Sequence, residues 1–239
     1  MVVAERGGPV EHLVDLSQEI YQGMYVFPGH LKTVVWEHHS HEETRKNFEG
    51  GFSYTSRGLL MSDHGPTHVD ALNHLDPRED APSIDEMSLG LFYGDGTCLD
   101  VSHKKPQTYI SSEELDEAVE ESGASVREGD ILLFYTGTYD RYHGSPEYLS
   151  QYPGLDESGG EWIADNGIKT FGVDAPSLDN PLSRTYPVHM MCRERGVTHY
   201  ENLANLGQLV GKRFTFAGFP LLIRDGTGSP VRAVAILDQ

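Results

Sequence analysis

Residues 64–74 read HGPTHVDALNH, which places three histidines and one aspartate within eleven positions. His64 and His68 have the four-residue spacing of one helical face, but Gly65 and Pro66 between them disfavour a helix. We therefore predict a turn through Gly65 and Pro66, followed by an extended segment. In that segment His68 and Asp70 lie two residues apart on one face of a strand, and the turn brings His64 back towards them.

This stretch predicts a metal site, because imidazole and carboxylate groups bind zinc, manganese and iron well. His74, four residues beyond Asp70, is predicted as a further ligand or as a nearby acid or base. A polar surface turn is the alternative, but the density of histidines favours the metal site. Three protein ligands leave a metal under-coordinated, so at least one more ligand is expected from elsewhere in the chain.

The remaining histidines supply candidates for that ligand. His189 and His199 both lie near Glu201 in VHMMCRERGVTHYENLANL (188–206), and spacing alone does not choose between them. Glu201 is predicted at the start of a helix, where the helix dipole stabilises a carboxylate. A second dense group, EHHSHEE (37–43), is expected to be a solvated loop. Structural or surface roles are expected for the isolated histidines, which are His12, His30, His103 and His143.

The bulk composition predicts a water-soluble protein with a single domain. With 239 residues and 38% hydrophobic content, a single domain spanning residues 1–239 is the expected organisation, and no apolar window is long enough for a membrane span. The opening MVVAERGGPVEH lacks the features of a secretory signal, and Cys98 and Cys192 are too few for a disulfide framework. We therefore expect a cytoplasmic protein.

The charge balance restricts the possible partners. Thirty-seven acidic and eighteen basic residues give a net charge of −19, which repels nucleic acids and anionic membrane surfaces. A small molecule is the expected partner. The acidic residues are dispersed and only six residues are lysine, which suggests adaptation to high salt; an ordinary acidic bacterial protein is the alternative.

The secondary-structure pattern favours a β-rich α/β domain. A helix is predicted over 112–122, which opens with a serine cap and acidic residues, and further helices over 160–166 and 201–210. The last two predicted strands flank DGTGSP, so they are expected to form a hairpin or to be neighbours. Apolar runs bounded by Gly, Pro or Asp predict strands at 34–36, 54–61, 131–136, 170–173, 214–223 and 231–237.

The spacing His-x3-His-x-Asp-x3-His resembles the signature of the metal-dependent cyclase family, which includes kynurenine formamidases and isatin hydrolases. Three further stretches resemble the same family, so the resemblance covers nearly the whole chain. They are LVDLSQEIYQGMYVFPG (13–29), FGVDAPSLD (171–179) and ENLANLGQLVGKRFTFAGFPLLIRDGTGSPVRAVAIL (201–237).

The resemblance implies a ligand set and a catalytic residue. It implies that the first two motif histidines and the aspartate bind metal, with a later histidine and a glutamate twelve residues beyond it, which selects His189 over His199. The implied metal ligands are thus His64, His68, Asp70, His189 and Glu201, and His74 is the implied catalytic acid or base. The implied fold is a β-rich, swivelling β/β/α domain, as a dimer or higher oligomer, holding one or two ions of Zn²⁺ or Mn²⁺.

The function that follows is hydrolysis of a C–N bond in a small amide, with N-formylkynurenine as the preferred substrate. A metal would activate water and polarise the carbonyl, and His74 would protonate the leaving group. Where formamidases typically have His-Thr-Gly-Thr-His, this chain has Gly65-Pro66 inside the motif, which weakens any transfer of substrate identity. Two alternatives stay open: a hydrolase of a cyclic imide, lactam or lactone, and a non-catalytic metal-binding or small-ligand-binding protein.

Overall fold

The computed structural model describes residues 12–237. The stretch on which the targeting prediction depends, residues 1–11, and the last two residues of the predicted domain lie outside this range. A nine-stranded mixed sheet organises the described residues. Its strands, in chain order, are β1 (His12–Asp15), β4 (His68–Asp70), β5 (Tyr93–Asp100), β7 (Ile131–Tyr135), β9 (Thr170–Val173), β10 (Thr198–Glu201), β11 (Arg213–Ala217), β12 (Gly228–Pro230) and β13 (Val234–Leu237).

The sheet has a parallel centre and antiparallel edges. Its order is β1-β13-β11-β5-β7-β9-β10-β4-β12, with β5, β7, β9 and β10 parallel. Strands β4 and β12 extend the sheet antiparallel beyond β10, and β11, β13 and β1 extend it antiparallel beyond β5. The β-rich α/β class predicted from the sequence is confirmed.

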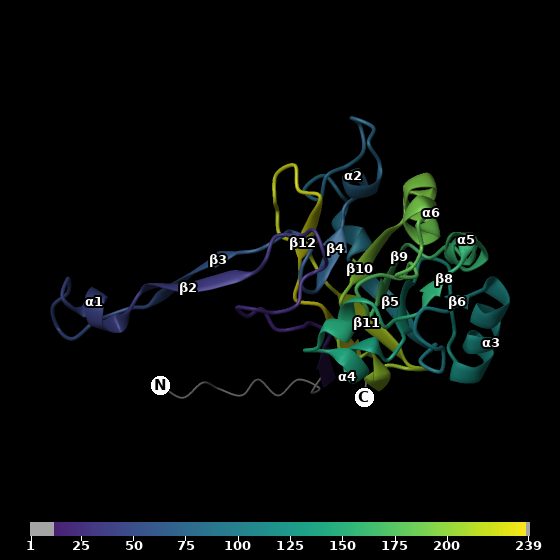
Figure 1. Cartoon of the computed structure of the whole chain (residues 1–239), viewed down its shortest axis with the longest axis horizontal. Coiled ribbons are helices and arrows are strands. Elements are labelled where there is room, and N and C mark those ends of the chain that lie inside the picture. Colours follow the sequence, from purple (N-terminus) through teal and green to yellow (C-terminus); the bar gives the residue numbers. More distant parts are fainter. Residues whose placement is uncertain (1–11, 238–239) are drawn as a thin grey trace.

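Each face of the sheet has its own apolar core. Along β7, Leu132 and Phe134 point into the core under the helices, while Ile131 and Leu133 point into the core on the other face. The helices that cover the first core lie on one side of the sheet (Figure 1). They are α3 (Ser112–Ser122), α5 (Glu157–Asp165) and α6 (Pro187–Arg195).

The shorter elements connect these layers. The short helices are α2 (Leu72–Leu75), α4 (Thr138–Tyr142), η1 (Leu89–Leu91), η2 (Pro146–Leu149) and η3 (Leu206–Gln208). Strands β6 (Tyr109–Ile110) and β8 (Gly154–Leu155) form a small parallel pair. None of the helices within residues 12–237 is long and apolar enough to cross a membrane.

Capping side chains set the helix boundaries. Helix α3 spans the predicted 112–122: the Ser111 hydroxyl accepts from the Glu114 backbone N–H, and the Glu114 side chain accepts from the Ser111 backbone N–H. Gly123, with φ of 64°, ends the helix. Helix α5 begins at Glu157, three residues before the predicted start, because Asp156 caps it.

The helix predicted over 201–210 is wrong. Glu201 is the last residue of β10, and only the short turn η3 follows. Asn202 and Asn205 adopt left-handed backbone conformations, with φ of 58° and 61°, which a helix does not tolerate. Between them, the Leu203 backbone N–H donates to the Val173 carbonyl and so extends the pairing of this segment with β9. The position of Glu201 is therefore fixed by a strand and not by a helix start.

The last two predicted strands are neighbours but not a hairpin. Strand β11 ends at Ala217, six residues before the predicted end, and pairs directly with β13. The segment between them contains β12, which pairs with β4 at the far edge of the sheet. This long connection carries Thr227 to the cluster predicted at 64–74.

A two-stranded arm projects from the body of the molecule (Figure 1). It consists of β2 (Val34–His39) and β3 (Ser56–Leu60), with the short helix α1 (His41–Arg45) at its tip. The EHHSHEE segment is thus the end of a strand followed by a helix, and not the predicted loop. Its His38 and His41 side chains are exposed, as expected for a solvated stretch.

Candidate metal centre

The 64–74 segment folds as its sequence predicts. The chain bends at residues 63–64 and 66–67 and then enters β4, which carries His68 and Asp70 on one face. The bend brings His64 close to Asp70, with His64 Nδ1 2.8 Å from Asp70 Oδ1. His68 Nε2 lies 3.2 Å from the same oxygen. Two imidazoles therefore meet one buried carboxylate.

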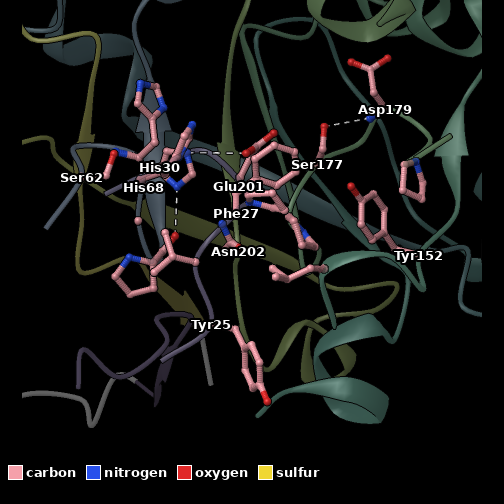
Figure 2. A pocket seen from close by; sticks show the side chains of 18 of the residues that line it. Tyr25, Phe27, His30, Ser62, His68, Tyr152, Ser177, Asp179, Glu201 and Asn202 are labelled. Atoms are coloured by element: carbon pink, nitrogen blue, oxygen red, sulfur yellow. Dashed lines mark hydrogen bonds and ion pairs between the residues drawn. The ribbon is translucent and has the colours of Figure 1, made fainter. Parts of the chain in front are cut away.

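Strand β10 and helix α6 bring the second half of the predicted ligand set to the same place. The register of β10 on β4 places Glu201 opposite His68, and Glu201 Oε2 is 3.6 Å from His68 Nε2. Figure 2 shows these two side chains pointing towards each other. On α6, His189 presents Nε2 at 3.9 Å from Glu201 Oε1. All five predicted ligands thus converge.

The chemistry of the converging atoms fits a divalent metal ion. His68 Nε2 and Glu201 Oε1 are buried and have no hydrogen-bond partner among the described residues. Leaving such atoms unpaired is costly unless something else occupies their lone pairs. Ligands about 2.1 Å from a common metal lie roughly 3.0–3.5 Å apart, which is close to the separations found between these side chains. The donor set suits zinc or manganese.

Outer contacts orient the histidine rings. His68 Nδ1 lies 3.0 Å from the Pro66 carbonyl, to which it donates, so Nε2 keeps its lone pair for the centre. His189 Nδ1 lies 2.5 Å from Asp179 Oδ2, and the same carboxylate accepts the Val188 and His189 backbone N–H groups at the start of α6. Asp179 therefore fixes both the helix start and the ring that the helix carries.

The electrostatics of the centre favour an ionised Asp70 and a protonated His189 in the metal-free protein. Burial raises the pKa of Asp70, but the charges and hydrogen bonds of His199, His64 and His68 outweigh it and hold that pKa well below its usual value. For His189, burial lowers the pKa, while the hydrogen bond to Asp179 and the charge of Glu201 raise it to about 9 overall. A divalent cation at this centre would take the place of protons held by such imidazoles.

His74 lies next to these side chains, and ligand atoms of His64, Asp70 and His74 all lie within 4.8 Å of one another. Its Nε2 is 3.9 Å from Asp70 Oδ2, its ring lies 4.0 Å from that of His64, and 32% of its side chain is exposed. Burial, together with the charges of His64, His189 and His199, lowers the pKa of His74 to about 4 despite Asp70. The imidazole is therefore neutral at pH 7 and can accept a proton.

The centre lies at the base of a cavity of about 390 Å³. Tyr25 and Phe27 line the cavity, whereas Trp36 lies over Gly58 on the arm. Ser177 and Asp179, which belong to the 171–179 segment, also line it (Figure 2). A small aromatic molecule fits a cavity of this size and lining.

Two histidines at this site, His30 and His199, do not belong to the predicted ligand set. His30 lines the cavity, with its ring 5.5 Å from that of His64, although an isolated histidine predicted only a structural or surface role. Its place directly after the Pro28-Gly29 turn was the one available signal. His199, passed over in favour of His189, has its Nε2 3.4 Å from Glu201 Oε1. Its separation of two residues from Glu201 identifies a shared face only once that segment is known to be a strand.

Comparisons with known proteins agree with the fold and identify the family of the chain. Residues 14–180 match the model of the Cyclase family, described as "Putative cyclase". The kynurenine formamidase of Bacillus cereus is 27% identical over 225 residues, which cover 92% of this chain and 95% of that protein. An uncharacterized protein of Methanocaldococcus jannaschii is 31% identical over 229 residues, with 94% and 99% covered.

Solved structures share the fold. Isatin hydrolase A from Labrenzia aggregata, bound to benzyl benzoate, superposes with a TM-score of 0.83 at 24% identity, covering 96% of this chain and 94% of that one. An isatin hydrolase bound to the product analogue thioisatinate gives a TM-score of 0.84 at 19% identity, covering 96% and 93%. The similarity extends over nearly the full length of each partner.

Proposed function

This chain belongs to the cyclase family of metal-dependent hydrolases, and we propose that it cleaves the amide C–N bond of an arylformamide, with N-formylkynurenine as the preferred substrate. The observation that carries this proposal is the convergence of five ligand-type side chains at the base of a cavity with an aromatic lining. The sequence relatives named kynurenine formamidase support the choice of amide.

The proposed metal ligands are three imidazoles and two carboxylates. When bound, zinc or manganese lowers the pKa of water and polarises a carbonyl oxygen. The chain would hold the ion with His64, His68, Asp70, His189 and Glu201. Since Asp70 and Glu201 each offer two oxygens to different imidazoles, the set can accommodate one ion or two.

His74 is the proposed catalytic acid and base. It lies at the cavity wall next to Asp70, where it can reach a substrate without occupying a ligand position. A neutral imidazole can accept a proton from the attacking water and then donate it to the departing amine nitrogen. The aromatic side chains of Tyr25 and Phe27 would bind the ring of the substrate, while Ser177 and Asn202 would supply polar contacts at the cavity wall.

A cyclic imide, lactam or lactone is the second candidate substrate class, and one observation favours it. The cavity lining, taken from the described residues, contains neither Lys nor Arg. The amino-acid carboxylate of N-formylkynurenine would therefore lack a cationic partner within this chain, whereas an uncharged cyclic amide such as isatin needs none. The likeness of the fold to two isatin hydrolase structures supports this second class.

Assays of the metal-loaded protein against N-formylkynurenine, isatin and a lactone panel separate these classes. Hydrolysis of N-formylkynurenine with the highest kcat/KM supports the main proposal, and preference for isatin or a lactone supports the second. Tight metal binding without hydrolysis of any of them would instead indicate a non-catalytic binding protein. The presence of His74 beside a complete ligand set argues against that last reading.

Assembly and location are also part of the proposal. We expect a homodimer or higher oligomer in the cytoplasm, acting on a small molecule and on neither nucleic acid nor membrane. The arm supports the oligomer, because its apolar side chains face solvent in a single copy. They are Val34, Trp36, Phe48, Phe52, Leu59 and Leu60.

A further inference from the structure

His199 lies beside the centre but does not line the cavity. It lies on β10 two residues before Glu201, so both side chains leave the same face of the strand. The side chain is fully buried, and its Nε2 lies 3.4 Å from Glu201 Oε1 and 3.5 Å from Asp70 Oδ2. That nitrogen has no hydrogen-bond partner among the described residues. A buried, unpaired imidazole nitrogen directed at two carboxylates is the arrangement of a metal ligand.

The ligand atoms fall into two groups that share Asp70. One oxygen of this carboxylate, Oδ1, faces His64 and His68, while Oδ2 faces His199 at 3.5 Å and His74 at 3.9 Å. Ligand atoms of Asp70, His189 and His199 all lie within 4.8 Å of one another. A carboxylate with different imidazoles at each oxygen is suited to bridging two cations.

We propose that His199 is a metal ligand, and that it completes a second metal position together with His189 and the shared carboxylates Asp70 and Glu201. This inference rests on the proposed function, because it takes the centre to be metal-dependent. The first position is then formed by His64 and His68 with the same two carboxylates. The chain would hold two divalent cations, each with two imidazoles and both carboxylates in common.

The surroundings of His199 hold its ring in the orientation this role needs. The ring stacks on Phe171 of the neighbouring strand β9, with centroids 5.0 Å apart and planes 8° from parallel. Its Nδ1 lies 3.7 Å from the sulfur of Cys192 on α6. When Nδ1 carries the proton and directs it at the sulfur, Nε2 presents its lone pair to Asp70 and Glu201.

A core histidine is the competing role. In that case Nε2 carries the proton and donates it to the two carboxylates, so His199 would position Asp70 and Glu201 without touching metal. The two roles differ in the number of ions bound and in the distance from an ion to Nε2. Both quantities are measurable without any assay of hydrolysis.

An anomalous difference map of the wild-type protein crystallised with Co²⁺ is the deciding test. We expect two peaks, one of them about 2.0–2.2 Å from His199 Nε2. Two peaks that both lie beyond bonding distance of His199, or a single peak bound by His64 and His68, would overturn the inference while leaving a metal-dependent enzyme intact. A protein that binds no Co²⁺ would overturn the proposed function as well.

Substitutions test the same inference in solution. His199→Gln and His199→Phe, the second of which keeps an aromatic ring on Phe171, should each weaken binding of the second Co²⁺ by tenfold or more in calorimetric titrations. The matched control His103→Gln removes an exposed histidine from the turn after β5 and should bind two ions like the wild type. Circular dichroism and thermal unfolding of the metal-free variants establish folding. If both variants fold and still bind two ions with unchanged affinity, the proposal is wrong. If either variant misfolds, the anomalous map of the wild-type protein decides.

Discussion

His68 and Glu201 face each other across the paired strands β4 and β10, with His68 Nε2 3.6 Å from Glu201 Oε2. These residues are 133 positions apart in the chain, yet they are direct partners in the sheet register. A shift of one residue in that register would move both side chains to other neighbours. Backbone pairing therefore determines where these two side chains lie. The contacts with Pro66 and Asp179 then orient the rings of His68 and His189.

Asp179→Asn should weaken metal binding by about 10–100-fold. The amide nitrogen of asparagine would donate to His189 Nδ1, which forces the proton of the ring onto Nε2 and removes the lone pair that faces the centre. Calorimetric titration of the metal-free protein with Zn²⁺ measures the change. Asp156→Asn, which alters the equivalent cap of α5 with no histidine nearby, is the control and should bind normally. Equal Zn²⁺ affinities in the two variants would show that Asp179 stabilises the start of α6 and does not orient His189 for metal binding.

His74→Ala should retain metal near the wild-type amount while lowering kcat by about 10²–10⁴-fold. The side chain lines the cavity, and the proposed ligand set does not include it, so its removal should take away the proton carrier and leave the five ligands in place. Metal content by mass spectrometry and steady-state kinetics on the same preparation give both values. A variant that purifies without metal would instead make His74 a ligand.

The sequence predicted the bend and the strand at 64–74 well, because neighbouring residues determine both. A glycine and a proline fix the bend, and the two-residue period of a strand aligns His68 with Asp70. The positions of His189, His199 and Glu201 depend on packing and strand pairing between distant segments, which no local sequence pattern predicts. The apolar spacing of Leu203, Leu206 and Val210 was read as a helix, yet Asn202 and Asn205 take left-handed conformations that divide the segment. That error concealed the shared face of His199 and Glu201.

Leu59→Glu on the arm should shift the protein from dimer to monomer. The Leu59 side chain is 52% exposed on β3, and burying a carboxylate in an apolar contact between two copies is strongly unfavourable. Light scattering coupled to size-exclusion chromatography measures the mass. Leu222→Glu changes an even more exposed leucine away from the arm and should remain dimeric. A wild-type protein that is monomeric at all concentrations would refute the arm as an assembly surface.

Salt should stabilise the fold, because the net charge of −19 makes the compact chain repel itself. The melting temperature should rise between about 0.1 M and about 3 M NaCl as screening shortens the range of this repulsion. Replacing three exposed glutamates of α3 together, by Glu117→Gln, Glu120→Gln and Glu121→Gln, should reduce the rise. A melting temperature that is flat or falling with salt would contradict adaptation to high salt.

Asp174→Asn should stabilise the protein at pH 8 and have little effect near pH 4. Burial raises the pKa of Asp174 to about 6, although hydrogen bonds from the Thr136 hydroxyl and backbone N–H oppose the rise. The folded protein thus holds this proton to a higher pH than the unfolded chain, whose value is near 3.8. Stability from this group is present in full below pH 3.8 and is lost as the pH rises through about 6.

Asparagine avoids that loss because it stays neutral and its amide oxygen can still accept from Thr136. The expected gain at pH 8 is about 1–3 kcal/mol in the free energy of unfolding, measured by urea denaturation at both pH values. Asp130→Asn is the matched control: this buried carboxylate pairs with Arg213, so its neutralisation should destabilise the protein at pH 8. An Asp174→Asn variant that loses the same stability at pH 4 and pH 8 would show that packing, and not the charge of Asp174, determines its effect.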